Sequence, residues 1–148
     1  MQDEDRFGLT ERLVDSLHTE AMVLADEARA YFDENGRAER DALPARDRVL
    51  FSCESLKVTT RLMHVVAWLL SRKVTGLRTQ TTQALRPLPD AIDSLPDDVD
   101  LLPATAQHLI RATCDLQERV RRLESEMARG AEGGSPVRSM LGQLERAL

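Results

Sequence analysis

Three histidines and two cysteines are the side chains in this sequence with the most reactive chemistry. His64 lies in the run HVVAW, within an apolar stretch, where a helical histidine could accept a phosphoryl group. Helical phosphoacceptor histidines are typically followed closely by a Lys and a Gly, and neither follows His64. A partly exposed helical histidine without a catalytic role is the simpler interpretation.

The remaining reactive groups do not form a recognisable site. His18, His64 and His108 could bind a metal only if the fold assembled them, because no His or Cys pair has the i, i+4 spacing of one helix face. Cys53 and Cys114 lie far apart in the sequence and are expected to be buried thiols. No serine lies in a nucleophile elbow, and no glycine-rich turn joins a strand to a helix. We therefore expect no metal, cofactor or catalytic residue.

Basic residues offer one alternative. Small helical enzymes can bind dianionic substrates with cations that project into a bundle, and Arg46, Arg48, Lys57 and Arg61 are candidates. The apolar seams described below contain no basic position, which favours a solvated face for these cations. A small all-helical enzyme or phosphotransfer module using His64 or this Arg-rich face remains the alternative to a non-enzymatic protein.

Composition sets the class of protein. The 148 residues suit one domain, and 42% hydrophobic, 30% charged and only 3% aromatic residues indicate a soluble helical chain. A net charge of −5 predicts no nucleic-acid partner. The start MQDEDRFG lacks the apolar core of a secretory signal, so we expect a cytoplasmic protein. The apolar run 62–70 is flanked closely by charges and is too short to span a membrane.

Apolar spacing predicts three long helices that position all of these groups. The first follows Thr10 and ends before Gly36, the second follows Pro44 and ends at Gly76, and the third follows Pro103 and ends before Gly130. Each has mainly apolar side chains at steps of three and four residues, the spacing of a buried helix face. We expect an all-α, antiparallel three-helix bundle with a long central helix.

Two segments interrupt this pattern. Pro87, Pro89, Pro96 and Pro103 predict a Pro-rich loop between the second and third helices, with a short turn near Asp90–Ser94. We expect its leucines and Ile92 to pin it to the bundle. Residues 1–129 would form the bundle, and residues 130–148 a flexible tail with a short amphipathic segment. The apolar residues of that segment, which we predict to recruit a partner, are Val137, Met140, Leu141 and Leu144.

The second helix has more apolar surface than two neighbouring helices need. One seam centres on Met63, with Val49, Leu56, Leu70 and Val74 within about 60° of it on a wheel of 100° per residue. A second apolar stripe could be core between widely spaced helices, or a surface for a second copy or a partner. We favour the surface, with Trp68 as an anchor at its rim. The predicted interface residues are Phe51, Val58, Leu62, Val65, Trp68 and Leu69.

Three stretches of the sequence resemble one bacterial family. ESLKVTTRLMHVVAWLL in the second helix, EARAYFDENGRAER before it and LRPLPDAIDSLP after it are similar to the regulator of CtrA degradation (RcdA) family. The resemblance implies a dimeric three-helix bundle that acts as a non-enzymatic adaptor in cell-cycle-regulated proteolysis. It also implies partners: the ClpXP protease with a response-regulator-type adaptor, and protein cargo such as CtrA.

Overall fold

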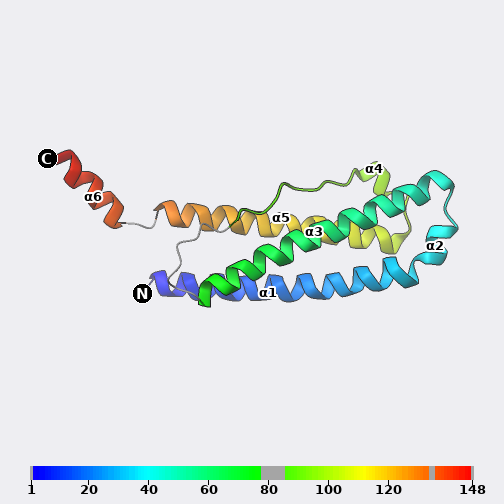
Figure 1. The fold of residues 1–148 in the computed structure, drawn as a ribbon, viewed down its shortest axis with the longest axis horizontal. Helices are drawn as coiled ribbons and strands as arrows, with labels where there is room; N and C mark the ends of the chain where they lie inside the picture. Colours follow the sequence, from blue (N-terminus) through cyan, green and yellow to red (C-terminus); the bar gives the residue numbers. More distant parts are fainter. Residues whose placement is uncertain (1, 78–85, 134–135, 148) are drawn as a thin grey trace.

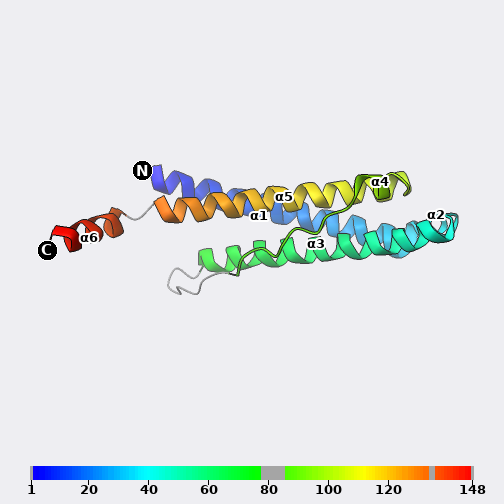
Figure 2. The same cartoon turned by 90° about the horizontal axis from the view of Figure 1, so that it is seen from above.

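In the computed structural model, every regular element within the described residues, 2–77, 86–133 and 136–147, is a helix. Three long helices lie side by side (Figures 1 and 2): α1 (Gln2–Ala30), α3 (Ala45–Leu77) and α5 (Ala104–Gly133). The shorter elements are η1 (Tyr31–Asn35), α2 (Arg37–Asp41), α4 (Pro96–Val99) and α6 (Pro136–Ala147). The prediction of an all-α protein is confirmed.

The directions of the long helices differ from the predicted antiparallel arrangement. α1 runs opposite to α3 (Figure 1). Phe32, just after the end of α1, makes an edge-to-face contact with Phe51 near the start of α3. α3 and α5 run in the same direction (Figure 1), and Arg61 of α3 bonds to Thr113 of α5. The antiparallel prediction is therefore wrong for the α3–α5 pair.

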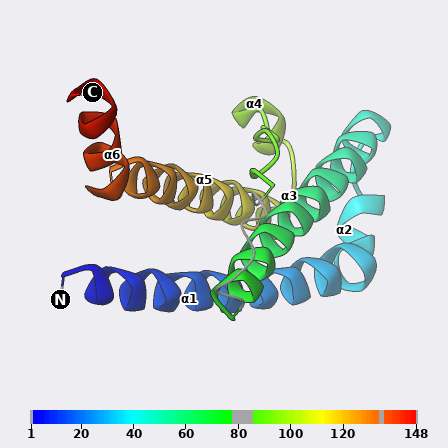
Figure 3. The ribbon, with the colours of Figure 1, turned by 60° about the vertical axis from the view of Figure 1, so that its left-hand side comes forward.

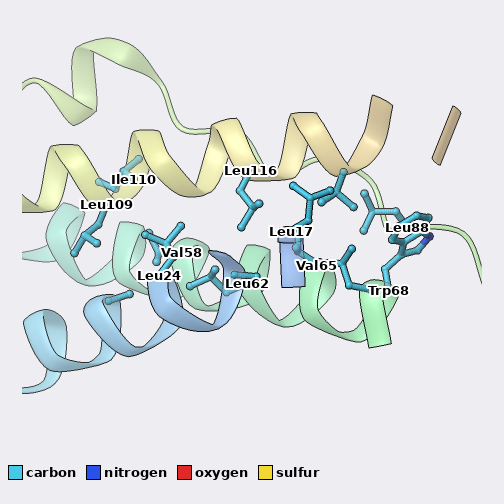
Figure 4. Close-up of a cluster of buried hydrophobic side chains, with 14 of the residues drawn as sticks. Leu17, Leu24, Val58, Leu62, Val65, Trp68, Leu88, Leu109, Ile110 and Leu116 are labelled. Carbon is cyan, nitrogen blue, oxygen red and sulfur yellow. The ribbon is translucent and has the colours of Figure 1, made fainter. Parts of the chain in front are cut away.

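A strap of extended chain explains this direction. Residues 86–95 have no regular secondary structure and return along α3 towards α4 (Figure 2). Leu88 lies beside Trp68 (Figure 4), and Ser94 bonds to Glu54. Six extended residues span about 20 Å, close to the roughly 21 Å that fourteen residues of helix cover. The strap thus carries the chain back, and the turn predicted at Asp90–Ser94 does not form.

The first helix begins earlier than its predicted N-cap. Thr10 lies inside α1, and its hydroxyl donates to the carbonyl of Arg6 one turn back. At the other end, the π-helical turn η1 brings the backbone of Gly36 against Tyr31. A Cβ at Gly36 would lie 2.9 Å from the Tyr31 ring, so only glycine fits at this position.

The core lies along the axis between the three long helices (Figure 4). The seam predicted for the third helix is confirmed, since its positions from Leu102 to Leu123 are buried. The steps of three and four in the first helix predict a seam of Leu13, Leu17, Ala21, Leu24, Ala28 and Tyr31, and all of these are buried apart from Leu13. These two helices contribute the narrow apolar faces that their spacing predicted.

The central helix is turned by roughly half a revolution from its predicted orientation. The expected core seam faces outwards, and Val49, Leu56, Met63, Leu70 and Val74 are 44–70% exposed. The second apolar stripe instead packs into the bundle. This orientation of α3 turns Glu54 and Arg61 towards their hydrogen-bond partners in the strap and α5. Both of these charged side chains are 0% exposed.

Candidate protein-binding surface

The six residues predicted to form an interface lie inside the bundle. Their side chains are 0–6% exposed and pack among residues of α1, α5 and the strap (Figure 4): Phe51, Val58, Leu62, Val65, Trp68 and Leu69. Side chains this deeply buried offer almost no surface to another molecule in the same fold, and of the six only Leu62 lines the open groove described below. The prediction of this stripe as an interface is therefore wrong, and its alternative, a buried second stripe, describes the structure.

The opposite face of α3 has the properties of an interaction surface. Every exposed side chain of α3 between Val49 and Val74 is uncharged: Val49, Ser52, Cys53, Leu56, Thr59, Met63, Ala67, Leu70 and Val74. Solvent-facing positions of a surface helix normally include several charged residues. An uncharged face that extends over seven turns suits burial against another protein.

An open groove runs beside this face, between α1 and α3. It has a volume of about 650 Å³. Met22, Ala25 and Phe32 line it from the α1 side, with Leu62, Met63, Val66 and Leu70 from α3. Arg29 and Asp33 are the charged residues of its lining and stand on one wall. The shape and lining suit the apolar side chains of a partner helix.

The strap side of α3 has a different, polar character. Glu54 accepts hydrogen bonds from Lys57 Nζ at 2.9 Å and from the Ser94 hydroxyl, which itself accepts from Arg61. Arg61 Nε donates to the carbonyl of Ile92 at 2.8 Å. These groups satisfy two buried charges, which would otherwise be strongly destabilising.

This network includes Arg61, one of the four cations that could have bound a dianionic substrate. Arg61 is fully buried and bonded, so it is unavailable to a dianionic substrate, while Arg46 and Arg48 are exposed near the start of α3. His64 is half-buried, and its Nδ1 lies in the interior without a hydrogen-bond partner. Within the described ranges, no group of three His, Cys, Asp or Glu side chains could hold a metal ion.

The predicted recruiting residues of the tail lie on α6, which stands beyond the end of α5 and apart from the three long helices (Figure 3). Met140, Leu141 and Leu144 are 54–67% exposed. The side chain of Val137 lies outside the described part of the chain. Within that part, no helix is long and apolar enough to cross a membrane.

The fold and these surfaces define an all-helical protein with an apolar face suited to contact with another protein. A family model described as "Protein of unknown function (DUF1465)" matches residues 6–148. No curated protein matches the chain. Among solved structures, RcdA from Caulobacter crescentus CB15 is similar, with a TM-score of 0.65 and 30% identity over 78% of this chain and 90% of that one.

The chain therefore belongs to the RcdA family, as its sequence predicted.

Proposed function

We propose that this protein is a non-enzymatic adaptor that helps deliver protein substrates, such as the response regulator CtrA, to the ClpXP protease. It would act together with a response-regulator-type adaptor, as family membership implies. The observation that carries this proposal is the uncharged outer face of α3 beside the α1–α3 groove. Such a surface supports binding to a protein rather than chemistry on a small molecule.

We infer that a second copy of the chain covers this face and forms a homodimer. Val49, Leu56, Met63 and Leu70 recur every seven residues on α3, the repeat that lets two helices pack along a shared seam. Small residues, Ser52, Thr59 and Ala67, lie between them and allow close approach. This seam replaces the interface predicted from the sequence.

Substitutions on the seam test the dimer. Leu56→Glu combined with Met63→Glu should give a monomer by light scattering, because two carboxylates per chain would have to be desolvated in the interface. Circular dichroism should remain that of a folded bundle, since both side chains are exposed. Val23→Glu is the matched control: Val23 is 54% exposed and lies outside the groove lining. An unchanged mass for the double variant would remove this interface.

We further propose that residues 130–148 form a recruiting tail that contacts the protease complex through Met140, Leu141 and Leu144. A short helix is marginal on its own, and its apolar stripe favours docking on a partner. Leu141→Glu with Leu144→Glu should slow cargo degradation without affecting the bundle. Equal degradation rates for the variant and the unmodified chain would exclude this role for the tail.

A further inference from the structure

The main chain of the strap is held by side chains rather than by another backbone. The Gln117 carboxamide accepts from the N–H of Ile92 at 3.2 Å and donates to its carbonyl at 3.4 Å. Arg61 donates to the same carbonyl, Arg121 donates to the carbonyl of Pro89 at 2.8 Å, and Glu124 accepts from the N–H of Leu88 at 2.6 Å. An amide side chain paired with both backbone groups of one residue recognises extended chain whatever its sequence.

Few side chains of the strap add to this recognition. Between residues 86 and 95 only Leu88 is buried, and Ile92 and Ser94 are half-buried. The other side chains of this stretch are exposed. A segment held through its backbone, one leucine and the Ser94 hydroxyl can be exchanged for another extended segment that carries the same anchors.

The strap also leaves buried donors without partners. Trp68 is 4% exposed, yet its indole Nε1 has no hydrogen-bond partner, and neither does Nε of Arg72 one turn further along α3. The Arg72 guanidinium lies 4.6 Å from the centre of the Trp68 ring. Unpaired buried donors are costly, which points to a missing acceptor at this end of the strap.

The strap's own sequence explains why that acceptor is absent. Leu88 lies beside Trp68 (Figure 4), and the residues before it are Arg86 and Pro87. The side chain of Arg86 carries only hydrogen-bond donors, and the side chain of Pro87 carries neither a donor nor an acceptor. Glu124 already lies close enough to Arg72 to interact with its charge, and a carboxylate in place of Arg86 would add the hydrogen-bond acceptor that Arg72 Nε and Trp68 Nε1 lack.

We propose that the surface of α3 and α5 beneath the strap is a peptide-binding site that the strap covers in cis and that an extended acidic segment of a protein partner covers in trans. The partner's backbone takes the positions of residues 88–94, and an aliphatic residue replaces Leu88. A carboxylate two residues before it, at the position of Arg86, pairs with Arg72 and the indole N–H of Trp68. The biological role of this site rests on the proposed adaptor function, because an adaptor must hold a segment of its partner.

Peptide binding to the full chain tests the site without protease or cargo. The probes are labelled peptides EPLPDAIDSL and QPLPDAIDSL, which differ only in the charge of the first residue. The native strap competes as a tethered ligand, so the full chain carries Leu88→Ala to loosen it. Fluorescence anisotropy reports binding, and emission from Trp68, the single tryptophan, reports the site directly.

The Glu peptide should bind this variant at least tenfold more tightly than it binds the unmodified chain, and at least fivefold more tightly than the Gln peptide does. Arg72→Met should abolish the preference for Glu, and Gln117→Leu should weaken both peptides. If Leu88→Ala does not fold, as judged by circular dichroism, Ile92→Ala loosens the strap instead.

Absence of binding to a folded, strap-loosened variant would overturn the proposal, as would equal binding of the two peptides. A third variant gives an independent check: Arg86→Glu supplies the carboxylate in cis and should block both peptides. Because no protease is present, this site can fail while delivery to ClpXP succeeds, and the reverse outcome is equally distinguishable.

Discussion

The buried Arg61 gives the most demanding test of the fold. Arg61→Met removes hydrogen bonds to Ile92, Ser94 and Thr113 and leaves the carboxylate of Glu54 buried, with Lys57 as its remaining cation. The Ser94 hydroxyl bridges Arg61 and Glu54, and removing one of two opposite buried charges typically costs about 3–5 kcal/mol. At roughly 2–4 °C per kcal/mol for a chain of this size, the melting temperature should fall by about 6–20 °C.

Urea unfolding followed by circular dichroism measures this loss of stability. A double-mutant cycle separates the coupling between Glu54 and Arg61 from their interactions with other residues. Glu54→Leu with Arg61→Met removes both charges and should recover most of the loss, because an apolar pair needs no compensation. The control is Arg122→Met on α5, whose exposed ion pair with Glu118 contributes no more than about 0.5 kcal/mol. A cost below about 1 kcal/mol for Arg61→Met would refute the buried network.

Three further predictions concern other parts of the bundle. Gly36→Ala should lower the free energy of unfolding by more than about 1 kcal/mol, because a Cβ would strike Tyr31, whereas Gly130→Ala, in open space on α5, should raise it by up to about 1 kcal/mol. Val58→Glu should abolish cooperative thermal unfolding, because Val58 is 0% exposed, and survival of the fold would contradict the orientation of α3. The hydrogen bond from Arg119 lowers the pKa of Glu20 from its ordinary value. Stability from this exposed pair should therefore be present above that ordinary value and be lost as the pH falls through the lowered pKa, and Arg119→Met should flatten acid unfolding curves there, by a small amount because of solvent screening.

The sequence predicts the helices of this fold better than their orientation. The seam of α5 is predictable because a narrow apolar stripe faces a charged one, which leaves only one way to bury the helix. α3 has apolar residues around most of its circumference, so its spacing allows two opposite orientations. The choice depends on Glu54, Arg61 and Trp68, which recur every seven residues beneath the strap and are buried.

A signal for the correct orientation is nevertheless present in the sequence. The positions of α3 that prove to be exposed include no charged residue between Val49 and Val74. The charged positions Glu54 and Arg61 share the other side with Val58 and Val65, and charges on an apolar face indicate a buried network when a polar loop can cover them. The partners of these charges, Ser94 and the Ile92 carbonyl, depend on the path of the strap, which local spacing cannot predict.

Reconstituted proteolysis tests the central claim most directly. Degradation of purified CtrA by ClpXP, with the response-regulator-type adaptor present, would be measured while the concentration of this chain is increased. An adaptor that bridges two partners should accelerate degradation at low concentration and inhibit it in excess, when cargo and protease bind separate copies. We predict this rise and fall for the unmodified chain. A degradation rate that does not respond to the chain at any concentration would contradict the account.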